Sequence, residues 1–385
     1  MRMTAHDEKM SDEKKMKIEE LRVVKVLGRG AMGTVLLVVQ EACKDHPFAL
    51  KLISKDSKDQ QFLRKSRGIE REREILSSLH HPFLPSLMGE IETHNMVGWA
   101  IEYCPGGDLH FLRQMQPDRT FSESAIRFYA AEVVLALEHL HSKGIVYRDL
   151  KPENILLQRT GHIMLTDFDL SKRLQPQPNE SKSSLNQDHQ HSSEQTRGWK
   201  VFSKNLTSKP KKSQFPQAST QNSTGPLRSN SFVGTDEYVA PEVVTGEGHG
   251  FSVDWWSLGI FLYELLYGRT PFKGLTSKET FTRILLMSPK LMGPSTPLHS
   301  LILRLLEKNP QKRMGFCNGA SEVKSHEFFT GLQWDSIHQL CRPPVVPDLD
   351  KTLNHILTSE LQDLLSVSTS EEEEETSDSE LDGHF

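Results

Sequence analysis

Several acidic and basic residues of this chain are spaced as the transfer of a phosphoryl group would require. The segment Y-R-D-L-K-P-E-N at 147–154 contains Asp149, Lys151 and Asn154. Such an aspartate can accept or steer the proton of an attacking hydroxyl, the lysine can neutralise charge on the transferred phosphate, and the asparagine can hold a metal ion. Asp167 in D-F-D offers a hard oxygen ligand for a hard cation.

A glycine-rich segment and a strand lysine could form the phosphate-binding side of the same site. Gly28, Gly30 and Gly33 in L-G-R-G-A-M-G-T-V at 27–35 let the backbone approach phosphates where a Cβ would clash. A strand is expected next, which disfavours a dinucleotide-binding turn because that turn must open a helix. Lys51 lies in the apolar segment F-A-L-K, so its ammonium should point inward and needs an anion.

Together with A-P-E at 240–242 and D-W-W at 254–256, these segments resemble, in the same order, those of the eukaryotic protein kinases. The resemblance implies an α+β, bilobal kinase fold, with a small antiparallel-sheet N-lobe carrying one helix and a mainly helical C-lobe. It also implies a Mg²⁺- and ATP-dependent kinase acting on protein substrates. Lys151, two residues after Asp149, is typical of serine/threonine rather than tyrosine kinases.

Two departures from the common pattern narrow the resemblance to the plant group VIII of the AGC kinases. Asp169 replaces the glycine of the usual D-F-G, and 70 residues separate it from Ala240, where an ordinary kinase uses about 20. The short chain resembles the oxidative-signal-inducible and UNICORN-type members of that group. Asp169 also leaves open a pseudokinase that only binds partners, but the complete catalytic set favours an active enzyme.

The resemblance assigns roles to residues around the nucleotide. Lys51, Asp149 and Lys151 would be catalytic, and Asn154 and Asp167 would hold Mg²⁺. Glu72 would pair with Lys51, although Glu70 and Glu74 remain alternatives. The nucleotide-binding set would comprise Leu27, Gly28, Gly30, Gly33, Val35, Ala49, Lys51, Glu72, Glu102, Cys104 and Leu156.

The resemblance also predicts activation and substrate preference. An upstream phosphoinositide-dependent protein kinase would phosphorylate Ser231, with Ser229 as a neighbouring alternative, and the phosphate would face Arg148. Thr235 would bind the catalytic loop, Glu242 would pair with Arg313, and Asp254 would brace the loop. Three acids would select Arg or Lys upstream of the target Ser or Thr: Asp108, Glu153 and Glu264.

The chain divides by composition into a folded body and polar segments. We expect a flexible arm at 1–17, the N-lobe at 18–102 and the C-lobe at 103–329, with a disordered insert at about 171–230 that lacks apolar clusters. Within the lobes, helices are expected at 60–79, from Ser122 to Lys143, at 254–267, 297–308 and 321–329. An AGC-type tail would occupy 330–385, acidic and disordered from about 366, and its final G-H-F is a degenerate hydrophobic motif.

Composition restricts location and partners. Residues 360–385 carry ten carboxylates and no Lys or Arg, so the net charge of −5 becomes +5 over 1–359. No apolar run approaches the roughly 20 residues of a membrane helix, and four scattered cysteines fit reduced thiols. We expect a monomer in the cytoplasm or nucleus that does not bind nucleic acid, although the basic cluster at 209–212 could be an import or lipid patch.

Overall fold

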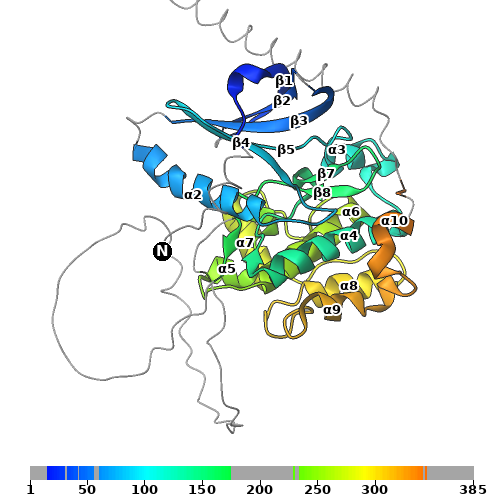
Figure 1. Cartoon of the computed structure of the whole chain (residues 1–385). Helices are drawn as coiled ribbons and strands as arrows, with labels where there is room; N and C mark the ends of the chain where they lie inside the picture. The colour runs from blue at the N-terminus through cyan, green and yellow to red at the C-terminus, as the bar shows by residue number, and fades with distance from the viewer. Residues whose placement is uncertain are drawn as a thin grey trace, which may run out of the picture. The chain divides into compact units, whose positions relative to one another are not determined.

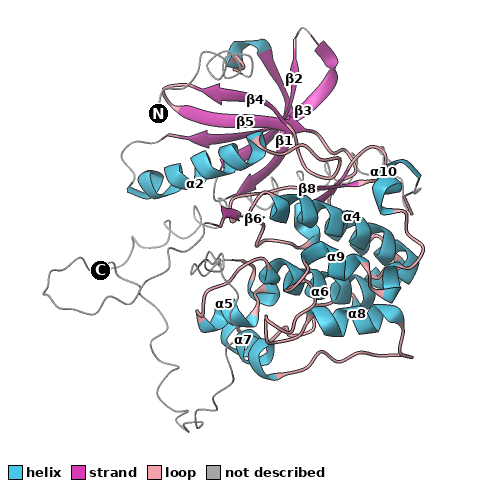
Figure 2. Cartoon of the chain, turned by 60° about the horizontal axis from the view of Figure 1, so that its bottom comes forward, coloured by secondary structure: helices cyan, strands magenta, loops and turns pink. Residues whose placement is uncertain are grey.

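The computed structural model describes residues 15–30, 33–41, 43–55, 60–174, 229, 234–340 and 343–344 (Figure 1). An antiparallel sheet of five strands forms the N-lobe, in the order β1-β2-β3-β5-β4. The strands are β1 (Leu21–Gly30), β2 (Gly33–Gln40), β3 (Cys43–Ser54), β4 (Leu87–Glu92) and β5 (Met96–Glu102). One helix, α2 (Gln60–Ser77), accompanies the sheet, as Figure 2 shows.

The C-lobe is mainly helical. Its helices are α3 (Leu109–Gln114), α4 (Glu123–Ser142), α5 (Pro241–Thr245), α6 (Ser252–Tyr267), α7 (Ser277–Leu286), α8 (Pro297–Leu305), α9 (Gly319–Lys324) and α10 (Ile337–Leu340). Two short antiparallel pairs carry the catalytic segments: β6 (Ile145–Val146) with β9 (Lys172–Arg173), and β7 (Ile155–Leu157) with β8 (Ile163–Leu165). Single-turn 3₁₀ helices are η1 (Ile18–Glu20), η2 (Pro117–Arg119), η3 (Pro152–Asn154), η4 (Asp236–Tyr238), η5 (Glu327–Phe329) and η6 (Trp334–Ser336). The predicted bilobal kinase fold is confirmed.

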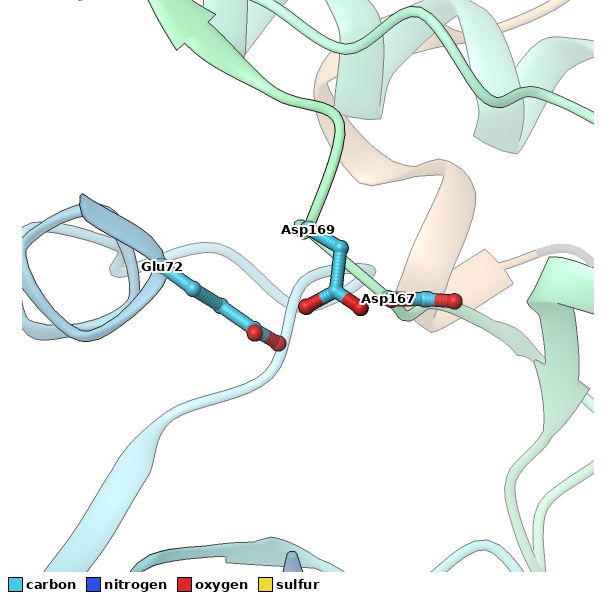
Figure 3. A group of neighbouring side chains, drawn as sticks. All are labelled: Glu72, Asp167 and Asp169. Atoms are coloured by element: carbon cyan, nitrogen blue, oxygen red, sulfur yellow. The ribbon is translucent and has the colours of Figure 1, made fainter. Parts of the chain in front are cut away.

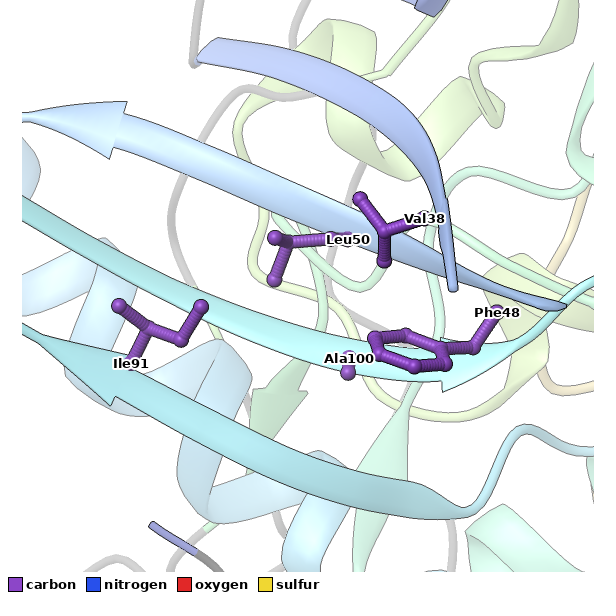
Figure 4. Close-up of a cluster of buried hydrophobic side chains, with 5 residues drawn as sticks. All are labelled: Val38, Phe48, Leu50, Ile91 and Ala100. Carbon is purple, nitrogen blue, oxygen red and sulfur yellow. The ribbon is translucent and has the colours of Figure 1, made fainter. Parts of the chain in front are cut away.

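Alternating apolar residues build the sheet and aim one lysine into the site. A buried cluster on one face of the sheet consists of Val38, Phe48, Leu50, Ile91 and Ala100 (Figure 4). Because side chains alternate along a strand, Lys51 points to the opposite face from its neighbour in this cluster. Its register partners, Val35 on β2 and Trp99 on β5, place it in the middle of the sheet.

Helix α4 forms where its sequence signals predict it. The Ser122 side chain accepts a hydrogen bond from the backbone N–H of Ala125, which caps the helix N-terminus. Gly144 adopts φ 74° just beyond the end, a conformation that favours glycine. The predicted core positions Ile126, Val133, Leu137 and Leu140 are completely buried, so this prediction is confirmed.

Some predicted boundaries need correction. Residues 171–174, assigned to the insert, belong to the folded domain, because β9 pairs with β6 and Leu174 is buried. Residues 15–17 of the predicted arm reach the sheet, where the Met16 N–H donates to the Glu90 carbonyl. The segment expected to be one helix at 321–329 is divided between α9 and η5. The rest of the insert except Ser229, and the acidic tail, lie outside the described residues.

A buried ion pair connects α5 to the end of the C-lobe. The Arg313 guanidinium donates to both carboxylate oxygens of Glu242, with N···O distances of 2.7 and 2.9 Å. Both side chains are almost fully buried, at 0% and 2% exposure. The predicted pairing of these two residues is confirmed. An unpaired charge at this depth would be strongly destabilising.

This pair generates a stability prediction. Arg313→Met should lower the free energy of unfolding by about 3–5 kcal/mol, because the buried Glu242 carboxylate loses its partner. Urea denaturation followed by circular dichroism measures the loss. Lys17→Met removes one member of an exposed pair and should change the same free energy by about 1 kcal/mol or less. If the two variants lose the same amount, the buried pair is not an anchor of the C-lobe.

Candidate active site

A cleft of about 670 Å³ contains every residue that the sequence assigned to the nucleotide. The glycine-rich loop forms one side, β3 and β5 form another, and the catalytic loop with D-F-D forms the floor. Sequence reasoning missed other lining residues, which come from α2, β5, α3 and connecting segments: Leu76, Pro85, Trp99, Ile101, Tyr103, Gly107, Phe111 and Thr166. Asp108, assigned to substrate binding, also lines this cleft.

The three loop glycines serve two different purposes. A Cβ at Gly33 would lie 2.3 Å from the Leu52 carbonyl oxygen, and its φ of 151° is one that other residues rarely adopt. This glycine is therefore required by the packing of β2 on β3. No atom lies within 4 Å of a Cβ built at Gly28 or Gly30, so these positions leave open space facing the cleft.

Lys51 is surrounded by carboxylates. Its Nζ lies 3.0 and 2.9 Å from the two carboxylate oxygens of Glu72 and 2.7 Å from Oδ1 of Asp169. Asp167 is farther away, at 3.8 Å. Glu70 and Glu74, the alternatives left open by the sequence, are exposed. Glu72 is thus the partner of Lys51 on α2, as the sequence predicted.

Burial and neighbouring charges both change the pKa values of the groups in this cluster. Burial lowers the pKa of Lys51, but the carboxylates of Glu72 and Asp169 outweigh it and raise that pKa overall. Burial raises the pKa of Glu72, and a hydrogen bond with Asp169 raises it further. Asp167 also has a raised pKa, chiefly because it is buried. The raised pKa values of Glu72 and Asp167 reflect burial and the crowding of three carboxyl groups around one ammonium.

The catalytic loop orients Asp149 through three neighbours. Lys151 Nζ and Asn154 Nδ2 donate to Asp149 Oδ2 at 2.8 and 2.7 Å. The hydroxyl of Thr235 donates to Oδ1 at 3.4 Å and accepts from Lys151 at 3.2 Å. The predicted contacts of Thr235 are confirmed. The carboxylate of Asp149 is thus held in one orientation, bonded to Asn154, which lines the cleft.

Asp254 on α6 holds the catalytic loop in place through hydrogen bonds to its backbone. Its carboxylate accepts the backbone N–H groups of Tyr147 and Arg148 at 2.9 and 2.7 Å, and contacts His141 Nε2 at 2.8 Å. Arg148 has φ 71°, a strained value for a residue with a side chain. The predicted bracing role of Asp254 is confirmed.

The middle residue of D-F-D anchors this segment in the core. The Phe168 ring is 1% exposed and packs edge-to-face on Tyr147 at 5.4 Å between ring centroids. The Tyr147 hydroxyl in turn donates to the carbonyl of Thr166. Asp167 has φ 60° between these two anchors. The packing therefore determines where its carboxylate points.

The three predicted substrate acids differ in their surroundings. Asp108 caps α3 by accepting the Phe111 N–H at 2.6 Å. Glu264 is buried, lies 3.0 Å from Arg113 and accepts the Tyr238 hydroxyl at 2.6 Å. Glu153 is 48% exposed and lies 3.1 Å from His110 Nδ1. Glu153 and Glu264 line a second cavity of about 540 Å³ beside Lys151, whereas Asp108 does not.

Arg148, Lys172 and His249 form a basic pocket around the buried side chain of Ser229. The Ser229 hydroxyl lies 3.3 Å from Arg148 Nη1 and 3.4 Å from Lys172 Nζ, and its backbone pairs with that of His249. Burial lowers the pKa of Arg148 to about 10 and, together with Arg148, lowers the pKa of His249 to about 4. The pocket is therefore electropositive. Ser231, the predicted acceptor, lies outside the described residues.

Comparison with known families decides which chemistry this geometry serves. The protein kinase domain matches residues 21–199 and 207–329, which is most of the chain. The chain belongs to the protein kinase family. The enzyme accordingly uses ATP with a divalent metal, and the cleft is its candidate ATP site.

Plant serine/threonine kinases are its relatives. Serine/threonine-protein kinase UCN of Arabidopsis thaliana is 45% identical over 357 residues, 86% of this chain and 85% of the relative. Serine/threonine-protein kinase OXI1 of the same plant is 45% identical over 363 residues, 90% and 83% of the two chains. Protein kinase PVPK-1 of Phaseolus vulgaris is 42% identical over 369 residues, 86% and 59%. The chain is a serine/threonine protein kinase, and the resemblance to AGC group VIII is confirmed.

The geometry of the catalytic loop generates the next prediction. Asp149→Ala should lower kcat on a Ser/Thr peptide by about 10² to 10⁴-fold, because a positioned base contributes that much to proton transfer. Nucleotide affinity and the circular dichroism spectrum should stay unchanged. A radiolabelled phosphate assay measures kcat. If the variant phosphorylates the peptide as fast as wild type, Asp149 is not the residue that orients the hydroxyl.

Proposed function

We propose that this kinase uses Mg²⁺ to transfer the γ-phosphate of ATP to Ser or Thr residues that follow basic residues. Its own activation segment would first be phosphorylated by an upstream phosphoinositide-dependent protein kinase. The observation that carries the catalytic part is the arrangement of Lys151, Asn154 and Thr235 around the Asp149 carboxylate. A monomer in the cytoplasm or nucleus completes the proposal. Separately, no helix among the described residues is long and apolar enough to span a membrane.

The residues of the cleft fit Mg²⁺. Carboxylate oxygens of Glu72, Asp167 and Asp169 all lie within 4.8 Å of one another, and hard oxygen donors suit this cation. Asp167 and Asn154 would hold the ion. Bound there, Mg²⁺ would shield the negative charge of the phosphates. Asp149 would orient the substrate hydroxyl, Lys151 would face the γ-phosphate, and Lys51 would bind the other phosphates.

The second cavity supports a basic substrate. Among its acids, Glu264 is already bound to Arg113, and Glu237 forms an ion pair with Lys273 at 2.9 Å. Glu153 is the more exposed of the two predicted acids in this cavity. We therefore expect Glu153 to contribute most to the recognition of a substrate arginine, with Glu264 beside it in the cavity and Asp108, outside the cavity, capping α3.

Peptide selectivity tests this recognition. Replacing the upstream Arg of a peptide by Ala should lower wild-type kcat/KM at least about tenfold, because one charge-assisted contact of about 1.5–3 kcal/mol is lost. Glu153→Gln should reduce that ratio, whereas Glu247→Gln, which removes an exposed carboxylate elsewhere, should preserve it. Equal wild-type kcat/KM for the two peptides would disprove the basic preference. A ratio unchanged by Glu153→Gln would assign the preference to another acid.

The basic pocket supports activation by phosphorylation. Arg148 immediately precedes the catalytic Asp149, so an anion bound to its guanidinium would also fix the loop. A phosphate adds about −1.5 to −2 charge and three strong acceptors, which suits Arg148 and Lys172 together. Ser231 is the acceptor expected from the sequence, and Ser229 is the one whose hydroxyl faces the pocket in the structure.

Variants of the two serines distinguish these acceptors. We expect Ser231→Ala to lower kcat at least tenfold, equivalent to about 1.4 kcal/mol of barrier, because the segment is no longer ordered by phosphate. Ser229→Ala should lower kcat less than Ser231→Ala does. Ser231→Asp should restore only part of the wild-type kcat, since a carboxylate has fewer acceptor oxygens than a phosphate. The assay measures kcat on one peptide after treatment with the upstream kinase. A larger loss in Ser229→Ala would identify Ser229 as the acceptor, and full activity in both would exclude this mode of activation.

A further inference from the structure

The ammonium of Lys51 has no donor left for a nucleotide. A lysine ammonium offers three N–H donors. Three carboxylate oxygens lie within hydrogen-bond distance of Lys51 Nζ: two from Glu72 at 3.0 and 2.9 Å, and Oδ1 of Asp169 at 2.7 Å. The shortest of the three contacts is the one with Asp169. Acceptors and donors therefore match in number before any phosphate enters the cleft.

Asp169 can make this contact because it carries a carboxylate where the usual D-F-G motif has a glycine without a side chain. Its carboxylate lies between those of Glu72 and Asp167 in the view of Figure 3. Asp169 also lines the ATP cleft, and its side chain retains 18% exposure. It can therefore turn away from Lys51 into the cleft without unpacking the core, whereas Glu72, at 4% exposure on α2, cannot do so as easily.

The negative charge of the cluster determines when a phosphate can replace Asp169 at Lys51. Glu72, Asp167 and Asp169 carry three carboxylates around one ammonium. Phosphates add further negative charge in a partly buried site, where Coulomb repulsion is stronger than in water. A carboxylate displaced from Lys51 therefore needs a cation nearby to remain in the cleft at low cost.

We propose that Asp169 competes with the phosphates of ATP for Lys51 and gives way readily only when a divalent cation enters with the nucleotide. Metal-free ATP then binds weakly, because it must displace a charge-assisted hydrogen bond and separate the Asp169 carboxylate from its cationic partner. With the metal present, the released carboxylate lies two residues from Asp167, beside the cation. Binding of ATP and of the cation is thereby coupled, and each raises the affinity of the other by the same factor. This inference rests on the proposed function, which supplies Mg²⁺ and its place at Asp167.

Nucleotide affinity of the full chain tests this competition without an activity assay. Calorimetry measures Kd for ATP in EDTA, for ATP in excess Mg²⁺, and for adenosine. Asp169→Asn keeps the side-chain size but removes the charge, so it should tighten metal-free ATP about tenfold, the factor expected from one lost charge-assisted contact. The affinity gained on adding Mg²⁺ should fall by a similar factor. Adenosine has no phosphate and should bind both proteins equally.

Two further variants make the outcome decisive. Glu74→Gln removes an exposed carboxylate from the same helix as Glu72 and should leave all three affinities unchanged. Asp169→Gly should tighten metal-free ATP as Asp169→Asn does, and equal adenosine binding shows that each variant is folded. Unchanged or weaker metal-free ATP binding in both Asp169 variants would overturn the proposal and make Asp169 a positioning residue for Lys51. Wild-type protein that binds adenosine but not ATP with Mg²⁺ would instead contradict the proposed function.

Discussion

The catalytic loop depends on one completely buried carboxylate, that of Asp254. It is 0% exposed, and it accepts two consecutive backbone N–H groups from a segment more than a hundred residues earlier in the chain. Arg148 can keep its strained φ of 71° because these bonds outweigh the strain: a hydrogen bond to a charged group contributes about 1.5–3 kcal/mol, and such a conformation costs about 1–3 kcal/mol. The position of Asp149 follows directly, since it is the next residue.

The same loop connects the two lobes through charge. Asn154 donates to Asp149, and its carbonyl accepts the backbone N–H of Thr166, one residue before Asp167. Asp167 and Asp169 then face Lys51 on β3 of the N-lobe. Any shift of the sheet relative to the catalytic loop must therefore separate an ammonium from carboxylates in a partly buried site. This resistance keeps Lys51, on the nucleotide side of the site, in a fixed position relative to Asp149, which would face the substrate hydroxyl.

Sequence reasoning predicted those parts of the site in which short motifs specify the backbone. The glycine loop, the catalytic loop and the cap of α4 at Ser122 are of this kind, because neighbours in sequence are also neighbours in space. The choice of Glu72 over Glu70 and Glu74 needed the helix orientation, which only packing determines. The contact of Asp169 with Lys51 could not be predicted either, since it joins residues 118 positions apart.

Long-range pairing also explains why the predicted substrate acids turned out unequal. The arginine that binds Glu264 lies 151 residues earlier, and nothing in the local sequence of either residue marks the pair. Asp108 reads equally well as a surface acid or as a helix cap until the Phe111 N–H is seen to bind it. The start of the insert was misplaced because β9 is only two residues long and pairs with a distant strand. Such a strand has no periodicity that a sequence can display.

The two cations proposed to bind phosphates, Lys51 and Arg148, have opposite electrostatic surroundings. Lys51 has excess negative charge around it, which raises its pKa, so a phosphate gains little there unless a metal ion offsets the carboxylates. Arg148 is buried beside a serine hydroxyl and Lys172, and its pKa is lowered to about 10. Lys172 beside Arg148 adds a second positive charge, so the phosphate proposed above for the activation segment would not need a metal ion there. On this proposal the chain separates nucleotide phosphate, which arrives with a cation, from covalent phosphate, which arrives without one.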